Sequence, residues 1–473
     1  MIKSKIIDIL GNLSRDELKK FSDYLSSPVF NKREIILKLF NAYKRHYPEF
    51  EGNKFTKEKI FRKILPGKEY NDEIFRNLNS QLLKLAEEFL SYLNYSGNIF
   101  NVKKHLLLEI NSRKLLSLFE KNFEETKRII GNDNKRDLEF FYHEYNLYLQ
   151  KDIYNSYINK FSKKDIFEAE KNLLVFYLIK MMEIQNYILY ESRILGLDGK
   201  MFLDSNFAGE ILKNVPDEIN DLPQIKIYYN ALKLEQTNKS VYYRNLRNLL
   251  NEHGHLIEKE KHYNKYIDMI DYIKRNKPRE DTGTVRELFQ LRREIIEKGL
   301  FTGNFITNMF FLNLVKSGTR LKEFGWVEHF VEKYYPLLIE KYRESTRELS
   351  YAYLYFDKNE YDISMSHLAK VRYEDIFYNL EVRNMTSRIY YETESYDLLN
   401  DFLNSYRMYL SKNRSVSKQD YESHNLFISI TGSLYKIKES GKIHRLDDLE
   451  EKAVKKDFIN RYWVIEKIRE LEK

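Results

Sequence analysis

Helical periodicity runs through almost the whole chain, and it constrains the fold more than any other feature of the sequence. Near the N-terminus, Ile36, Leu39, Phe40 and Tyr43 recur at i, i+3, i+4 and i+7, the spacing of one face of an α-helix. Convincing strand alternation is absent from the sequence, and the 473 residues include only 16 Gly and 7 Pro. The sequence therefore predicts an all-α protein with short connections, at least about 70% helical.

The chain is too long for one compact core, because single cores stop growing near roughly 250–300 residues. We therefore expect several domains or a repeat array in which each unit contacts only its neighbours. Breaks near residue 97 and in the polar segment 276–283 suggest three blocks. These are a small helical N-terminal domain (1–96), an array of helical hairpins (97–280) and a block of helical repeats (281–473).

Composition restricts the location of the protein. The chain has no cysteine, which excludes disulfides and thiolate metal sites and fits a reducing compartment. The N-terminus lacks the apolar stretch of a signal peptide, and the strongest apolar run, residues 173–179, is far shorter than the ~20 residues that span a bilayer. We expect a cytoplasmic protein that does not enter the membrane.

The net charge of +8 has two interpretations. Residues 1–100 hold 18 Lys and Arg against 13 Asp and Glu, and a basic end can indicate nucleic-acid binding. The chain is also rich in Lys, Ile, Asn, Tyr and Phe, which AT-rich codons encode. No run of five like charges occurs, so codon bias is the stronger explanation.

The third block contains an internal repeat. Residues 355–362 match residues 390–397 after a shift of 35 positions, and a fainter copy precedes them by 37 positions, where Phe324 matches Tyr361. A period of this length, built of two helices, is typical of tetratricopeptide repeats.

The residues at particular positions of the repeat resemble the tetratricopeptide family. The first helix of two units carries a small residue that is followed three positions later by an aromatic residue. Both units also carry an aromatic residue at the turn between their two helices. These positions are Ala352 with Tyr355, Ser387 with Tyr390, and Tyr361 and Tyr396. Ser364 fits the small position on the second helix, whereas Leu399 departs from it and no proline ends either unit. The resemblance implies an α-solenoid of antiparallel helical hairpins, with Tyr361 and Tyr396 buried at the turns.

The whole chain also resembles an uncharacterised family of large helical proteins from Bacteroidota-type bacteria. The residues that carry this resemblance are Phe21, Tyr24, Leu25, Ser27, Pro28, Phe30, Asn31, Pro66, Gly67 and the segments 57–61, 70–72 and 390–392. The resemblance implies no activity.

Residues that could support catalysis or metal binding do not form a recognisable motif. His253, His255 and His262 cluster with two glutamates, but without the i, i+4 spacing that a helical zinc site prefers, and a solvated turn is the simpler interpretation. Phosphate-binding loops, His-Glu-x-x-His and Gly-x-Ser-x-Gly are absent. We expect no enzyme activity, no cofactor and no bound metal.

Residues 54–94 could instead form a DNA-binding element. A short helix after Thr56, a turn and a longer helix starting at Asp72 follow one another, the order in which a recognition helix is offered to a major groove. The order is similar to winged-helix activators that carry a tetratricopeptide array. Because every all-helical protein contains such sequences, plain helical packing is the main alternative.

The sequence favours a protein-interaction scaffold or adaptor, because stacked hairpins create an extended concave surface for a protein or peptide partner. In the tetratricopeptide pattern, the inward positions of two successive units are Tyr353 and Phe356, then Asn384, Arg388 and Tyr391. A solvated or self-packed face is the alternative for these five residues. A DNA-binding transcriptional regulator with a helical-repeat sensor is the second hypothesis, and the oligomeric state stays open.

Overall fold

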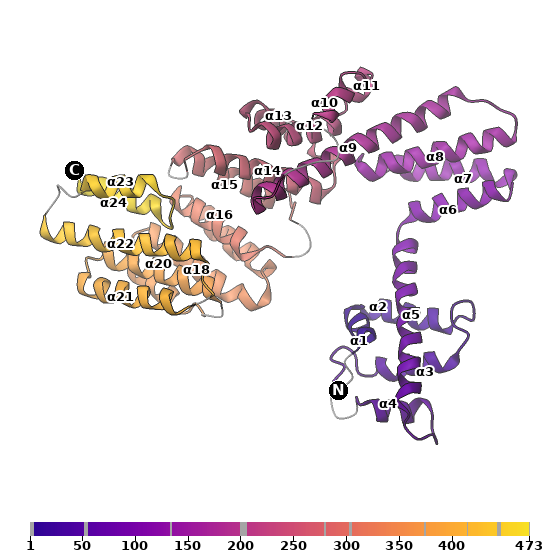
Figure 1. Ribbon diagram of the computed structural model, residues 1–473, viewed down its shortest axis with the longest axis horizontal. Coiled ribbons are helices and arrows are strands. Elements are labelled where there is room, and N and C mark those ends of the chain that lie inside the picture. The colour runs from indigo at the N-terminus through magenta and orange to yellow at the C-terminus, as the bar shows by residue number, and fades with distance from the viewer. Residues whose placement is uncertain are drawn as a thin grey trace. The chain divides into compact units, whose positions relative to one another are not determined.

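The computed structural model describes residues 4–51, 55–132, 135–198, 206–278, 281–301, 305–372, 375–413, 415–441 and 446–472. About 80% of the chain is helical, and the ranges described contain 24 α-helices and two 3₁₀ helices (Figure 1). Within these ranges no β-strand occurs, although an isolated bridge joins Ile306 and Leu338. The predicted all-α class is confirmed. No helix of the described ranges is long and apolar enough to cross a membrane.

The chain divides into two compact units, where the sequence suggested three blocks. The first unit comprises residues 1–134 and 139–173, and the second comprises residues 135–138 and 174–473. The boundary between them falls within one helix, α9 (Lys163–Leu195). The expected boundary near residue 280 does not separate units, because α14 (Lys259–Asn276) and α15 (Thr282–Glu297) pack on each other.

The first unit holds two hydrophobic cores, one formed by residues between positions 6 and 89 and one by residues between positions 107 and 169. The first of these cores lies wholly inside the block 1–96. Besides the start of α9, the helices of this unit are α1 (Lys5–Asn12), α2 (Arg15–Ser26), α3 (Glu34–Lys44), α4 (Lys57–Ile64), α5 (Asp72–Gly97), α6 (Ile99–Ser112), α7 (Leu116–Gly131) and α8 (Leu138–Tyr157).

Helix starts in this unit follow local capping chemistry. Thr56 Oγ1 accepts the backbone N–H of Lys59 at 3.4 Å at the start of α4, and Asn71 Oδ1 accepts that of Ile74 at 3.0 Å at the start of α5. Each side chain satisfies a backbone donor that the first helical turn leaves unpaired. The sequence therefore sets both helix starts locally.

The second unit contains the rest of α9 and all later helices. Its first helices are α10 (Phe207–Leu212), α11 (Asp217–Asn220), α12 (Pro223–Thr237), α13 (Ser240–His253), the 3₁₀ helix η1 (Gly254–Leu256), α14 and α15. They are followed by α16 (Asn308–Arg320), α17 (Phe324–Tyr334), η2 (Tyr335–Leu337), α18 (Glu340–Asp357), α19 (Tyr361–Leu368), α20 (Ile376–Glu392), α21 (Tyr396–Lys412), α22 (Lys418–Ser440), α23 (Leu446–Lys455) and α24 (Arg461–Leu471).

Three hairpins of the second unit share one turn geometry. Lys322, Asn359 and Glu394 have φ values of 61°, 63° and 56° and stand two residues before the second helix. In each turn, the next backbone N–H bonds at 2.9 Å to the carbonyl five residues earlier, which closes the first helix by a Schellman motif. These residues are separated by 37 and 35 positions, the spacing of the sequence repeat.

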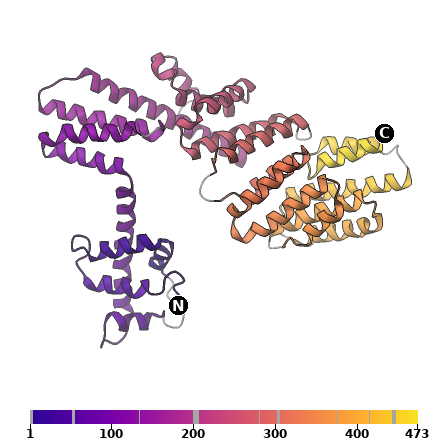
Figure 2. The same cartoon turned by 180° about the vertical axis from the view of Figure 1, so that it is seen from behind.

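Small residues allow one of these hairpins to close tightly. Ala352 on α18 and Ser364 on α19 are fully buried, and Ser364 Oγ donates to the Ala352 carbonyl at 2.8 Å. Figures 1 and 2 place α16, α18, α20 and α22 together in this unit, where they share one hydrophobic core with the partner helices of their hairpins. This pairing of consecutive hairpins is compatible with the expected solenoid.

Candidate binding face

The five residues expected to contact a partner lie on α18 and α20, the first helices of two successive hairpins. We call these residues and the neighbours named next the inner face. It comprises Lys316, Thr319 and Arg320 on α16, Tyr353, Phe356 and Asp357 on α18, Glu381, Asn384, Arg388, Tyr391 and Glu392 on α20, and His424 and Phe427 on α22.

Their predicted accessibility is wrong. The exposed fractions of Tyr353, Phe356, Asn384, Arg388 and Tyr391 are 4%, 5%, 1%, 1% and 2%. Side chains this deeply buried cannot contact a partner from solvent. The alternative of a self-packed face therefore describes them, because neighbouring helices and α24 cover the inner face.

A buried carboxylate joins three helices of the inner face. Lys316 Nζ lies 2.7 Å from Glu381 Oε2, and the hydroxyl of Tyr353 donates to the same oxygen. Burial raises the pKa of Glu381, but the charge and hydrogen bond of Lys316 and the tyrosine hydroxyl more than offset it, so the pKa lies below its ordinary value. The carboxylate is therefore charged and fixed in position.

Arg388 carries a buried charge with few hydrogen bonds. Its guanidinium centre lies 4.0 Å from the ring centroid of Phe356, while the nearest carboxylate oxygen, on Asp357, is 4.0 Å away. Its Nε has no hydrogen-bond partner, and Nη1 lies 3.4 Å from the sulfur of Met385. Burial raises the pKa of Asp357. Stacking on an aromatic ring is thus the main contact of this arginine.

A second polar network occupies the side of the inner face next to α21 and α22. The hydroxyl of Tyr406 bonds to Asn384 Oδ1 at 3.0 Å and to His424 Nδ1 at 2.7 Å. Burial lowers the pKa of His424, which favours its neutral form. The amide nitrogen of Asn384 is buried without a partner.

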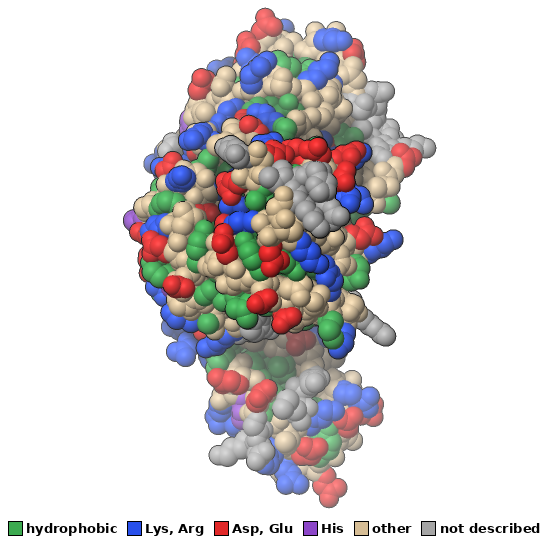
Figure 3. Space-filling view, turned by 90° about the vertical axis from the view of Figure 1, so that its left-hand side faces the viewer, with side chains coloured by type: hydrophobic (Ala, Val, Ile, Leu, Met, Phe, Trp, Pro, Cys, Tyr) green, Lys and Arg blue, Asp and Glu red, His purple; other side chains and the backbone are tan. Residues whose placement is uncertain are grey.

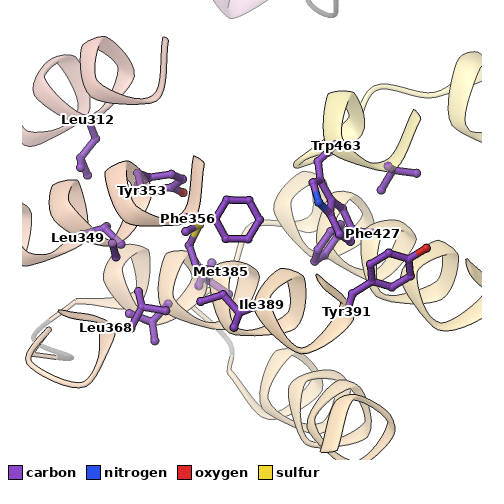
Figure 4. Close-up of a cluster of buried hydrophobic side chains, with 14 of the residues drawn as sticks. Leu312, Leu349, Tyr353, Phe356, Leu368, Met385, Ile389, Tyr391, Phe427 and Trp463 are labelled. Carbon is purple, nitrogen blue, oxygen red and sulfur yellow. The ribbon is translucent and has the colours of Figure 1, made fainter. Parts of the chain in front are cut away.

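Helix α24 packs on α22 and α23, and Trp463 holds it against the inner face. The indole lies edge-on to Tyr391, with centroids 5.2 Å apart at 83°, and 6.1 Å from Phe427 (Figure 4). Its Nε1–H donates to Glu392 at 2.6 Å, and Lys467, one turn later, lies 3.0 Å from the same carboxylate oxygen. The inner face therefore holds an amphipathic helix through an aromatic side chain and a lysine at i and i+4.

A polar cavity of about 650 Å³ lies beside α24. Residues of α16, α18 and α20, among them Arg320, Asp357 and Glu392, line one side, and Lys467 and Arg469 of α24 line the other. The ring of Tyr462 lies 4.3 Å from the guanidinium of Arg320. Helix α24 thus fills only part of the space enclosed by the hairpins.

Comparison with known proteins adds no relative. No protein family, curated protein or solved structure matches the chain. The tetratricopeptide resemblance and the resemblance to a Bacteroidota-type family therefore stay predictions, and the functional argument depends on the geometry of the inner face.

The candidate DNA-binding segment, residues 54–94, forms α4 and α5 from residue 57 onward. Helix α5 packs against α1, α2 and α3. Asn79 accepts the hydroxyl of Tyr43 at 2.6 Å, Gln81 accepts Arg33 at 2.6 Å, and Arg76 pairs with its neighbour Asp72 at 3.0 Å. Several polar side chains of this helix thus bond within their own domain.

Surface charge is mixed where Figure 3 shows it. Lys and Arg side chains are interspersed with Asp and Glu on that side of the molecule, without a continuous surface of one sign among the residues drawn in colour. DNA binding by residues 54–94 stays a prediction with no specific observation in its favour.

The three histidines of the candidate cluster, His253, His255 and His262, are dispersed around a helix junction. His255 is exposed, whereas His262 is buried against Gly254, where an added Cβ would lie 2.3 Å from the imidazole Cε1. In the described part of the chain, no three His, Cys, Asp or Glu side chains are placed to hold a metal ion. This glycine therefore has a packing role at the junction.

Sequence reasoning missed the residues that occupy the inner face. Trp463 and Lys467 lie in the last helix, outside the detected repeat. The available signal was the scarcity of tryptophan, since the chain has only two, combined with the apolar stretch Trp463–Ile465 and Ile468 one turn later.

Proposed function

We propose that the protein is an interaction scaffold whose inner face binds an amphipathic helix of a partner protein in place of α24. The observation that carries the proposal is the docking of α24, in which Trp463 and Lys467 both contact Glu392. A partner helix with an aromatic residue and a lysine at i and i+4 would make the same contacts. The proposal assigns no catalytic role to the chain.

The chemistry of the inner face suits helix recognition. Binding through a helix laid in a groove depends on a few side chains spaced i, i+3 and i+4, and buried aromatic anchors supply most of the binding energy in such interfaces. Tyr391 and Phe427 form the walls of the Trp463 site, and Glu392 gives it a charged acceptor. Such a site selects a helix that carries an aromatic anchor and a lysine four positions after it.

The proposal can be tested on the full chain with Trp463→Ala, which weakens the internal helix. The probe is a fluorescein-labelled peptide of residues 457–472, whose binding is followed by fluorescence anisotropy. We expect binding to the variant and at least about tenfold weaker binding to the unmodified protein, where α24 occupies the site. The same peptide with Trp463→Ala is the matched control and should not bind.

A charge reversal distinguishes recognition from non-specific adhesion. Glu392→Lys, added to the Trp463→Ala chain, should abolish peptide binding, and a peptide carrying Lys467→Glu should restore part of it by reversing the ion pair. Phage display of fragments of the proteins encoded in the same genome then identifies partners. Enrichment of helices with an aromatic residue and a lysine or arginine at i+4, displaced by the 457–472 peptide, is the expected result. Failure to enrich such helices on a variant that binds the peptide would overturn the proposed function.

A further inference from the structure

The second half of α9 carries a regular row of solvent-accessible side chains. The residues are Tyr177, Lys180, Ile184, Tyr187, Glu191 and Ile194, all within the second unit; Glu191 is half-buried and the other five are exposed. The four apolar members are 42%, 49%, 63% and 53% exposed in that order, and the Lys180 side chain is 46% exposed. We call this row the α9 stripe. Its steps alternate between three and four residues, the repeat of a coiled-coil seam.

The opposite side of α9 fixes the helix to its own unit. Leu178, Ile179 and Met182 are fully buried. Asn186 donates to Asp268 on α14 at 3.2 Å, and Arg193 donates to Glu235 on α12 at 2.6 Å. The stripe is therefore presented by a helix that is held in place, and its exposure does not result from fraying of the chain.

The stripe is complementary to itself in the antiparallel direction. When two copies are aligned about the midpoint between Ile184 and Tyr187, each of these residues faces the other in the second copy. The same alignment places Tyr177 opposite Ile194 and Lys180 opposite Glu191. A parallel alignment instead places lysine against lysine and glutamate against glutamate, which is destabilising.

We infer that two copies of the chain associate through α9, paired antiparallel about a twofold axis. A twofold interface requires that residue i contacts residue j and residue j contacts residue i, and the stripe satisfies this at every layer. Each side of the axis has three layers. Ile184 pairs with Tyr187 next to the axis, Lys180 forms an ion pair with Glu191 in the second layer, and Tyr177 pairs with Ile194 in the outermost layer. This inference does not depend on the function proposed for the inner face.

The surroundings of the stripe accommodate a second helix. A cavity of about 600 Å³ runs between α9 and α14, lined by Ile184, Tyr187 and Tyr190 on one side and by Tyr263 and Ile267 on the other. It offers space for the aromatic side chains of the second copy, which increases the buried apolar surface.

The charged layer can form without leaving a carboxylate unpaired. Lys180 lies 3.0 Å from Glu183, and Lys261 of α14 bonds to that same glutamate. Glu183 therefore keeps one lysine when Lys180 turns to the second copy. A charge that is buried without a partner is costly, so the second lysine on Glu183 matters for the stability of the dimer.

Charge exchange in the full chain tests the pairing. Lys180→Glu alone and Glu191→Lys alone each place like charges opposite one another in both ion-pair layers, and each should raise the dimer dissociation constant at least about tenfold. An equimolar mixture of the two variants restores opposite charges in both layers, so it should form heterodimers. Sedimentation velocity measures the species, and circular dichroism checks that each variant is folded. Unmodified protein that sediments as a monomer at all concentrations, or folded variants that dimerise as well alone as when mixed, would overturn the inference.

Cysteine crosslinking tests the direction, because the chain has no cysteine of its own. Tyr177→Cys and Ile194→Cys chains should form a mixed disulfide when oxidised together, and neither should crosslink to itself, since these positions are roughly 26 Å apart along the helix axis. Self-crosslinking of each variant without a mixed product would show a parallel pair and contradict the proposal.

Discussion

Substitution of Trp463 by alanine tests the docking of α24 quantitatively. The side chain is 1% exposed and contacts Tyr391 and Phe427. Removing a buried tryptophan costs about 3–5 kcal/mol. The lost hydrogen bond to Glu392 adds little, because Lys467 still pairs with that carboxylate at 3.0 Å. We expect α24 to open about 4 kcal/mol more easily.

Hydrogen exchange resolves where this loss occurs. A change of about 4 kcal/mol corresponds to a roughly thousandfold fall in the protection of residues 461–471. Trp326, the only other tryptophan, then reports unfolding of the hairpins by fluorescence during urea denaturation. Met408→Ala, at a side chain that is 56% exposed, is the control and should change protection less than about twofold.

Trp463→Phe separates packing from hydrogen bonding. It keeps most of the ring in contact with Tyr391 but loses the indole N–H, so it should cost about 1–2 kcal/mol. Protection of α24 that falls less than about fivefold in the alanine variant would refute the assignment of Trp463 as the anchor.

Four further outcomes can be measured. Tyr391→Ala should cost about 3 kcal/mol in urea unfolding, because Tyr391 is 2% exposed, and Tyr361→Ala, at a half-buried turn, about 1 kcal/mol, the reverse of the order that the sequence predicts. Gly318→Ala should destabilise α16 by about 1–3 kcal/mol, since its Cβ would lie 2.6 Å from Val327 Cγ2, whereas Gly325→Ala meets nothing within 4 Å and should stabilise α17. Burial lowers the pKa of His143 to about 4, below its ordinary 6.5. The first unit therefore has the full stability that the neutral imidazole allows above pH 6.5, and it loses stability as the pH falls from 6.5 towards 4. His143→Phe should reduce the difference between the urea midpoints at neutral and acidic pH. Arg388→Met should cost about 3–5 kcal/mol, because it removes the positive charge that acts most strongly on Asp357 and leaves only the weaker effect of Arg320. Adding Asp357→Asn should recover at least half; a double variant no more stable than the single one would show that the two charges are not coupled.

The sequence was sufficient to predict the all-α class and the spacing of the three equivalent turns. Both follow from local rules, namely the 3.6-residue period and the 35–37-residue spacing of equivalent positions. The pairing of Ala352 with Ser364 shows that these rules reach as far as the contacts within one hairpin.

Contacts distant in sequence were beyond such rules. Trp463 bonds to Glu392 across 71 residues, and Asn79 bonds to Tyr43 across 36. Periodicity indicates which side of a helix is apolar, but it does not identify the helix that covers it. For this reason the inner-face residues were expected to be open, and α5 was considered as an exposed recognition helix.

The turns illustrate a different limit. Lys322, Asn359 and Glu394 adopt a left-handed backbone conformation that glycine normally supplies. A search for breakers does not detect a lysine or a glutamate at such a position. The repeated aromatic residue that begins the second helix, at Phe324, Tyr361 and Tyr396, is therefore a better marker of these turns than glycine.

Occupation of the inner face by α24 has a consequence for any partner. A segment of the same chain competes at an effective concentration of about a millimolar when its tether is short and flexible. If α24 and a partner helix each have an intrinsic dissociation constant of about 1 μM for the inner face, the partner would show an apparent value near 1 mM, a thousandfold loss. The expected loss of about 4 kcal/mol on removing the Trp463 side chain is of the same size. That one substitution should therefore nearly remove the competition, and a partner that binds the unmodified protein as tightly as the variant must use a different surface.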